Sequence, residues 1–317
     1  MGTLGLKGLL KPQYILHPKQ ILRRIAWAVG MRPRTPRAVM LPWGLPLLID
    51  SRDNIGENIW LHGIYDLALT EALWRLTQRD DTAVDVGANI GYTASILCAQ
   101  VGKNGKVYTF EPHPQLFQAL LRNVESWKVH PNSGEIIAQE VAVSARNGKG
   151  CLKFFADFDR NNGTSAITEN VEDSTKNVLP VRLARLDSII PEGTPIAVLK
   201  VDVEGHELEV FRGLGKLLES KVIRDIVFEE TSAYPGPTHQ YLQSAGYSVL
   251  GLESNFWGVQ LVPPDRVKVN PYFPSNYIAT CERARAEDVF QSRGWCSLGG
   301  GSRRYRGWRD SRPGKPH

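Results

Sequence analysis

The chain has 317 residues, of which 42% are hydrophobic and 22% charged, and a formal net charge of +5. This composition excludes a wholly disordered chain, and the length predicts one or two domains whose core needs neither disulfides nor a structural metal. The apolar runs are too short for a membrane span, and early charges argue against a secretory signal. Four widely spaced cysteines favour reduced thiols in a cytoplasmic protein.

The charges are distributed unevenly along the chain. Residues 1–49 hold eight Lys/Arg and no acid, residues 282–317 hold nine Lys/Arg and four acids, and the segment between them has more acids than bases. An acidic body with basic ends is not typical of a nucleic-acid groove. We therefore expect a basic N-terminal arm and linker over 1–54, a folded domain over 55–281, and a basic, disordered tail over 282–317.

The arm contains an amphipathic segment at 19–30 and a proline-rich segment at 32–42. The apolar side chains of the first segment fall on one helical face, at Ile21, Leu22, Ile25 and Val29. Two interpretations stay open for this helical arm. It packs on the body, or it makes peripheral contact with the inner leaflet of a membrane. The second segment predicts a linker into the body.

Beyond the arm, helical and β-type patterns alternate. The first predicted elements are a helix at 61–78, a strand at 83–86, a helix at 92–101, a strand at 106–110, a helix at 114–127 and a strand at 136–143. β-type pieces at 152–155 and 178–183, around a polar loop at 157–164, predict an insertion. The alternation resumes with a strand at 196–203, a helix at 206–218, a strand at 225–229, a helix at 238–245, a strand at 247–252 and a strand at 276–281. This order predicts an α/β fold, a parallel sheet with helices on both faces.

The clearest motif is Val84-Asp-Val-Gly-Ala-Asn-Ile-Gly91, which joins a predicted strand to a predicted helix. Gly87 and Gly91 let the backbone approach a ligand, and the helix directs its first N–H groups toward it. Asp85 lies at the end of the strand, and Glu111 ends the next strand, twenty residues beyond Gly91. A carboxylate at Glu111 can accept hydrogen bonds from both ribose hydroxyls of an adenosine ligand.

Two adenosine ligands fit this turn, a nicotinamide dinucleotide and S-adenosylmethionine. The pattern G-x-N-x-G lacks the third glycine of the dinucleotide motif G-x-G-x-x-G. The acid before the turn suits a sulfonium cation better than a pyrophosphate. We therefore expect S-adenosylmethionine, and the alternative without a ligand is a tight turn between strand and helix.

A second cluster of charges, Lys200-Val-Asp-Val-Glu-Gly-His206, follows another apolar strand. Ligands of open α/β sheets bind outside the carboxyl ends of the strands, so Asp202, Glu204 and His206 are predicted to face the same crevice as the first motif. Glu229 ends the following strand and can reach that crevice too. Buried charges are unfavourable unless they are paired or bind a ligand. The structural alternative is helix capping by Asp202 or Glu204, neutralised by Lys200.

Taken in this order, the motifs resemble the FkbM family of S-adenosylmethionine-dependent methyltransferases. The matching stretches are Val84 to Gly91, Phe110-Glu-Pro-His-Pro114, Leu199-Lys-Val-Asp-Val-Glu-Gly-His-Glu207 with Val210-Phe-Arg-Gly213, and Ile226-Val-Phe-Glu-Glu230. The resemblance implies a Rossmann-like class I methyltransferase with a seven-stranded, mostly parallel sheet. It also implies O-methylation of a hydroxyl on a sugar, glycan or natural-product acceptor. By this resemblance Asp85, Gly87, Asn89 and Gly91 line the methionine and ribose of the cofactor, and Glu111 holds the ribose.

Two catalytic mechanisms fit the acids at the strand ends, Asp202, Glu204 and Glu229, together with His206. In one, Glu204 or His206 is a general base and Asp202 orients the acceptor hydroxyl. In the other, Asp202 and a second carboxylate hold Mg²⁺, which lowers the pKa of the hydroxyl. We favour the general base, because His206 beside two acids titrates near neutral pH. No His/Cys spacing suggests zinc, and we expect no dedicated metal site.

Two other functions stay open. A non-catalytic protein that binds an adenosyl ligand would need Glu111 and the glycines but not Asp202 and Glu204. A nucleic-acid methyltransferase would use the basic ends of the chain, but the usual N-P-P-[FYW] loop for a flipped base is absent. We therefore expect a small-molecule or glycan acceptor and no nucleic acid.

Overall fold

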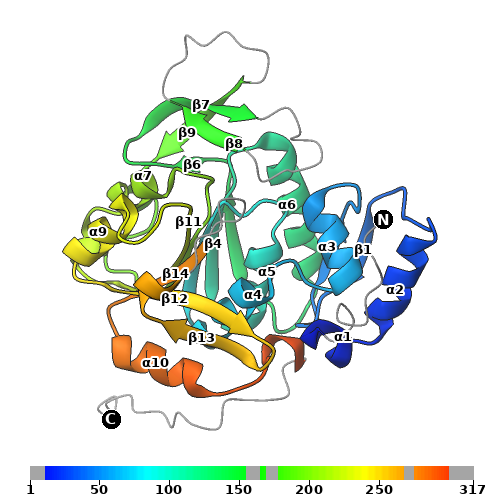
Figure 1. Ribbon diagram of the computed structural model, residues 1–317. Helices are drawn as coiled ribbons and strands as arrows, with labels where there is room; N and C mark the ends of the chain where they lie inside the picture. Colours follow the sequence, from blue (N-terminus) through cyan, green and yellow to red (C-terminus); the bar gives the residue numbers. More distant parts are fainter. Residues whose placement is uncertain (1–10, 155–164, 169–177, 268–274, 300–317) are drawn as a thin grey trace, which may run out of the picture.

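The computed structural model describes residues 11–154, 165–168, 178–267 and 275–299. A central sheet lies between two layers of helices (Figure 1). In order across this sheet the eight strands are β13 (Gly258–Val262), β12 (Ser248–Asn255), β14 (Ser275–Thr280), β11 (Ile223–Glu230), β10 (Ile196–Val201), β3 (Thr82–Val86), β4 (Lys106–Phe110) and β5 (Glu135–Gln139). Strands β11, β10, β3, β4 and β5 run parallel, and β14 is antiparallel to both of its neighbours. The predicted α/β class and mostly parallel sheet are confirmed.

The strand count differs from the seven expected. The eighth strand, β13, forms an antiparallel hairpin with β12 across a turn at Phe256 and Trp257. A hairpin adds a strand without a connecting helix, so the alternation of helices and strands did not predict it.

Each face of the sheet has its own core, because successive side chains of a strand point to opposite faces. The main helices are α4 (Leu67–Leu76), α5 (Tyr92–Val101), α6 (Pro114–Trp127), α7 (Glu207–Arg212), α8 (Lys216–Glu219) and α9 (Pro237–Ser244). Helices α4, α5 and α6 pack against Ala83 and Val198, whereas α7, α8 and α9 pack on the other face against Val84 and Leu199. The predicted bounds of β4, α5 and α6 match the structure.

Two predicted helices are each divided in the structure. The helix expected at 61–78 is replaced by α3 (Asn54–His62) and α4. Gly63 ends α3 in a left-handed conformation at φ 80°, and the Asp66 carboxylate caps α4 by accepting from the Leu69 N–H at 2.9 Å. The helix expected at 206–218 breaks after Arg212 into α7 and α8. The break between α3 and α4 places Tyr65 and Asp66 beside the carboxyl ends of the strands.

A small second sheet forms the predicted insertion, at the top of Figure 1. Its strands, in order, are β6 (Ala142–Val143), β9 (Val178–Ala184), β7 (Gly148–Phe154) and β8 (Ser165–Thr168). The single strand predicted at 136–143 is divided into β5 and β6. The predicted loop at 157–164 lies outside the described residues.

The chain ends pack more extensively than predicted. The segment expected to be a linker contains β1 (Arg37–Met40), which pairs with β2 (Pro46–Ile49) in an antiparallel hairpin. The side-chain amide of Asn123 on α6 accepts from the Leu48 N–H at 2.6 Å, which fixes this hairpin to the body. Ahead of it lie α1 (Pro12–Leu16) and α2 (Lys19–Ala28).

The expected tail begins too early at residue 282. Residues after it form α10 (Arg283–Gln291) and a short turn, η4 (Ser297–Gly299). The buried Arg75 guanidinium donates to the Ser292 and Gly294 carbonyls at 2.8 Å each, and Glu71 accepts from the Ser297 N–H at 2.9 Å. Residues 300–317 of the predicted tail lie outside the described residues. Among the helices of the described chain, none combines the length and the apolar character that crossing a bilayer requires.

Candidate active site

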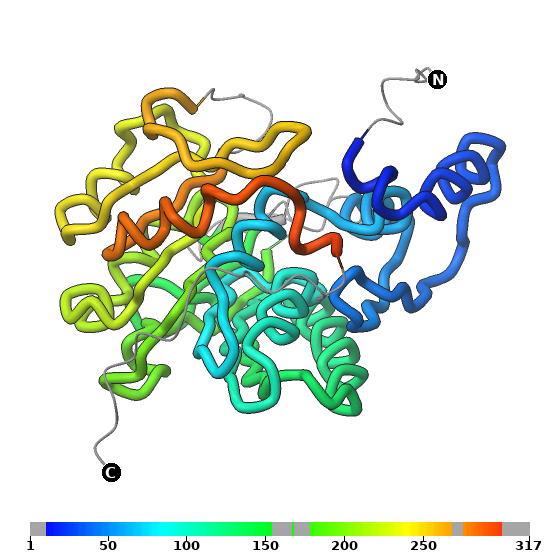
Figure 2. Tube along the Cα trace, turned by 90° about the horizontal axis from the view of Figure 1, so that it is seen from below, coloured from blue at the N-terminus to red at the C-terminus, as the bar shows by residue number. Residues whose placement is uncertain are grey.

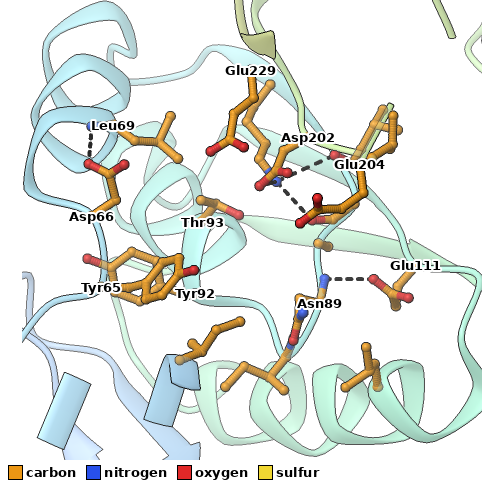
Figure 3. Close-up of a pocket in the computed structure, with 18 of the residues that line it drawn as sticks. Tyr65, Asp66, Leu69, Asn89, Tyr92, Thr93, Glu111, Asp202, Glu204 and Glu229 are labelled. Carbon is orange, nitrogen blue, oxygen red and sulfur yellow. Dashed lines mark hydrogen bonds and ion pairs between the residues drawn. The ribbon is translucent and has the colours of Figure 1, made fainter. Parts of the chain in front are cut away.

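A cavity of about 690 Å³ opens at the carboxyl ends of the central parallel strands (Figure 3). Both sequence motifs contribute to it, as do the α3–α4 connection and the small sheet. The lining residues include Asn54, Ile55, Asn58, Tyr65, Asp66, Gly87, Asn89, Thr93, Glu111, Leu152, Ile167, Lys200, Asp202, Glu204 and Glu229. Residues of both motifs line this one cavity, among them Gly87, Asn89, Asp202 and Glu204, whereas Asp85, Gly91 and His206 do not.

The turn after β3 has the conformation that its glycines permit. Gly87 has φ 77°, and a Cβ there would lie 1.9 Å from the Asp202 carbonyl oxygen, so a side chain would separate the two strand ends. Gly91 has φ 95°, and a Cβ there would lie 2.7 Å from Leu120 on α6. Gly87 lines the cavity, whereas Gly91 packs behind it. Gly91 therefore shapes the turn from outside the cavity.

Glu111 lies at one end of the cavity with both carboxylate oxygens fixed. Its Oε2 accepts from the Asn89 N–H at 2.8 Å and its Oε1 from the His113 N–H at 2.9 Å. Burial raises the pKa of Glu111 to about 7, although the hydrogen bonds from the two backbone N–H groups lower it. Each oxygen keeps a second lone pair, so the carboxylate can still accept from a ligand hydroxyl on each side.

Asp85 does not line the cavity but lies fully buried beneath it. Its Oδ2 accepts from the Thr93 hydroxyl at 2.6 Å, and its Oδ1 lies 3.3 Å from the Lys200 ammonium. Lys200 also donates to the Gly87 carbonyl at 2.8 Å and lies 3.4 Å from Asp202 Oδ2. Burial alone would lower the pKa of Lys200, but the charges of Asp85 and Asp202 raise it above its ordinary value. Lys200 therefore connects the two motifs.

The other end of the cavity gathers acids from three elements. Asp202 and Glu204 follow β10, Glu229 lies on β11, and Asp66 caps α4 (Figure 3). Burial, together with the charges of Asp202 and Asp66, raises the pKa of Glu229 to about 9. Burial of the Glu204 carboxyl and the charge of Asp202 raise the pKa of Glu204 to about 7, although the residue as a whole is exposed. These groups can hold protons near neutral pH.

His206 is placed differently from the sequence prediction. It is not among the lining residues, and its Nε2 lies 3.0 Å from the Ser144 hydroxyl, beside the small sheet. The neighbouring Glu207 folds back on the loop and accepts from the Val203 and Gly205 N–H groups at 3.2 Å each. The acids of the motif are therefore brought to the cavity, and its histidine is not.

Sequence reasoning missed several lining residues. Tyr65 and Asp66 fell inside a helix predicted to be continuous, although the glycine at 63 and an Asp three residues before Leu69 are end and start signals for helices. Burial and the charges of Asp202 and Glu229 raise the pKa of Tyr65. Leu152 and Ile167 come from the small sheet, and no local sequence signal places them here.

The described side chains do not form a metal centre. No group of three His, Cys, Asp or Glu residues in the part of the chain that the structure describes is arranged to hold a metal ion.

Comparison with known proteins agrees with the motifs. A family model described as "Methyltransferase FkbM domain" matches residues 85–249. The chain belongs to this family. The hexuronic acid methyltransferase AglP of Haloferax volcanii is 31% identical over 170 residues, which cover 52% of this chain and 63% of AglP. The methyltransferase sdnD of Sordaria araneosa is 26% identical over 196 residues, covering 52% of this chain and 73% of sdnD. The match thus spans less than two thirds of AglP.

A solved structure of the same family is also similar. The methyltransferase FkbM from Methylobacillus flagellatus aligns over 83% of this chain and 71% of its own, with 16% identity and a TM-score of 0.41.

Proposed function

We propose that this FkbM-family protein is an S-adenosylmethionine-dependent O-methyltransferase that acts on a hydroxyl of a sugar or similar polyol. The observation that supports this most directly is the single cavity with Glu111 at one end and Asp202, Glu204 and Glu229 at the other. The first end suits an adenosine ribose, and the second suits an acceptor hydroxyl and its proton.

The residues at the Glu111 end fit the proposed cofactor. The Glu111 carboxylate is held by two backbone N–H groups and keeps acceptor capacity for a pair of hydroxyls. In the proposal it holds the ribose, while Gly87 and Asn89 form the wall beside the methionine moiety. Asp85 acts indirectly, because it fixes Thr93 and Lys200, which both line the cavity.

The acids at the other end supply the base. S-adenosylmethionine brings a methyl group that its sulfonium makes electrophilic. Glu204 accepts the hydroxyl proton as the acceptor oxygen bonds to the methyl carbon, while the bond from that carbon to sulfur breaks and S-adenosylhomocysteine leaves as a neutral thioether. A base with a pKa of about 7 suits this step because it is partly ionised and still basic at neutral pH. Asp202 and Glu229 orient the hydroxyl, Glu229 as a protonated donor. This role for Glu204 replaces that of His206, which lies against Ser144.

The charge of the acceptor end supports the substrate class. Lys200 is the only cation among the described residues that line the cavity, against Asp66, Asp202, Glu204 and Glu229. Carboxylates accept hydrogen bonds from sugar hydroxyls but repel the phosphates of a nucleic acid. The name of AglP, a hexuronic acid methyltransferase, supports a sugar as the acceptor, while the charge of this end favours a neutral sugar over an acidic one.

Cofactor binding and methyl transfer test the proposal separately. Calorimetric titration should detect S-adenosylmethionine and S-adenosylhomocysteine but not NAD. Labelled cofactor should then transfer its methyl group to a cell extract, and glycosidase digestion of the extract should remove the acceptor while nuclease digestion should not. Binding without transfer would support a non-catalytic sensor instead, and loss of the acceptor after nuclease would support a nucleic-acid substrate.

The first prediction concerns the base. Glu204→Gln should lower kcat by about 10²–10⁴-fold without weakening S-adenosylhomocysteine binding, because only proton transfer is lost. The matched control is His206→Gln, which should change kcat by less than about threefold, since His206 lies outside the cavity. Equal losses in both variants would contradict the assignment. Activity that vanishes with EDTA and returns with Mg²⁺ would favour the metal mechanism over the general base.

A further inference from the structure

The helix α2 exposes its apolar side. Leu22, Ile25 and Val29 are 69%, 48% and 66% exposed, although a surface helix of a globular protein ordinarily turns such residues toward the core. Both predictions made for the arm started from this apolar face. The structure shows that the body does not cover it.

The polar side of α2 packs on the body instead. The Arg23 guanidinium lies 4.3 Å from the ring centroid of Trp60 on α3, and Arg37 lies 5.0 Å from the same ring. Arg24 donates to the Tyr14 hydroxyl at 2.8 Å. Because cations stack on aromatic rings along the inner side, the helix is held with its apolar face outward.

The segments that flank α2 in the sequence also expose apolar side chains. We name the arm patch as Ile15, Leu16, Leu22, Ile25, Val29 and Met31. These six are half of the twelve large hydrophobic residues that are exposed in the described chain. Helices α1 and α2 lie at the outer edge of the molecule in both views (Figures 1 and 2). A cluster of this kind marks an interaction surface.

The charges around the arm patch indicate its partner. Lys11, Lys19, Arg32 and Arg34 of the same arm are exposed, and no acid occurs in the sequence before Asp50. Exposed apolar side chains on an arm that also exposes cations and has no acids suit the interface of an anionic bilayer. A second copy of this chain fits less well, because a two-fold contact would place the same cations against one another.

We propose that the arm patch docks the protein on an anionic lipid surface, with Leu22, Ile25 and Val29 entering the headgroup boundary. The same surface would fix the position of the cavity, since α3 packs on α2 through Trp60 and lines the cavity through Asn54, Ile55 and Asn58. This inference depends on no step of the proposed reaction.

Vesicle flotation of the full chain tests the inference. The protein should float with vesicles of phosphatidylcholine and phosphatidylglycerol at low salt, and far less with phosphatidylcholine alone or at high salt. The triple variant Leu22→Gln, Ile25→Gln, Val29→Gln should partition at least about tenfold less. The matched control is Leu121→Gln with Val129→Gln, which alters exposed apolar residues elsewhere and should float like the parent chain.

Several outcomes would overturn the inference. The parent chain could fail to float on anionic vesicles at low salt, or the triple variant could float equally well. Light scattering that shows a dimer in the parent chain and a monomer in the triple variant would assign the arm patch to a second copy. A variant that begins at Lys11 could float when the parent chain does not. That result would show that residues 1–10 occupy the arm patch in the parent chain.

Discussion

The carboxylates at the two ends of the cavity differ in their hydrogen bonding. Glu111 receives one backbone N–H on each oxygen, and the buried Asp85 beneath it is paired with Lys200 and Thr93. At the other end, neither Glu204 nor Glu229 receives a hydrogen bond within the described chain, and burial together with like charges raises the pKa of both. Burial also raises the pKa of Glu111, but there the two backbone N–H groups oppose it.

This difference separates two tasks. A fixed and satisfied acceptor is already organised for a ligand that always binds in the same way, as a cofactor does. Unsatisfied acids that crowd one another are electrostatically unfavourable, and such groups are found where a proton or a polar ligand must be exchanged. The Glu111 end therefore resembles a binding site, and the Glu229 end resembles a reaction site.

Lys200 belongs to both ends, and its removal should have the largest effect. Lys200→Met leaves the buried Asp85 carboxyl group without its cationic partner, so the free energy of unfolding should fall by about 3–5 kcal/mol. Chemical denaturation measures this loss. The matched control is Lys216→Met, whose exposed pair with Glu192 spans 3.8 Å and should change stability by less than about 0.5 kcal/mol.

A second variant tests the cause of that loss. Asp85→Asn combined with Lys200→Met removes the unpaired charge, so the double variant should be more stable than Lys200→Met alone. If the double variant were less stable than the single one, the Lys200–Asp85 pair would not be what holds the two ends together.

The Glu111 end should give a smaller effect that depends on pH. The free protein holds a proton on Glu111 below a pKa of about 7, whereas ribose hydroxyls need the ionised acceptor. Affinity for S-adenosylhomocysteine should therefore fall as the pH decreases, by up to about tenfold per unit below pH 7. Calorimetry between pH 8 and pH 6, about one unit on either side of this pKa, measures the trend.

The control for this pH dependence is Glu111→Gln. It should bind more weakly at pH 8 but without the same slope, because it has no proton to lose. An affinity that is independent of pH in the parent protein would show that Glu111 is not a direct ligand of the ribose.

The sequence predicted the parts of the fold that local signals define. Strand β4 and helices α5 and α6 have the predicted bounds, because each is an apolar run that glycine, proline or charged residues delimit. The rule that ligands bind at the carboxyl ends of parallel strands correctly brought Glu111 and Asp202 to one cavity.

The remaining features depend on contacts between distant segments. Helix α10 buries only Ala286 and Phe290, so its apolar period was too weak to distinguish it from a solvated tail. The direction of His206 follows from Ser144, sixty-two residues earlier in the chain. The strand ends in the sequence grouped Asp202, Glu204 and Glu229 with His206. Only the tertiary structure shows that the three acids line the cavity and that the histidine does not.

The smallest predicted effect concerns the backbone of Glu204, at the Glu229 end of the cavity. Glu204 has φ 53°, a left-handed conformation that is unfavourable for any residue with a Cβ. Glu204→Gly removes both the carboxylate and this strain, whereas Glu204→Ala removes only the carboxylate. The glycine variant should therefore be more stable than the alanine variant by about 1 kcal/mol in chemical denaturation, and both should lose turnover. Equal stability of the two variants would show that the backbone at Glu204 is unstrained.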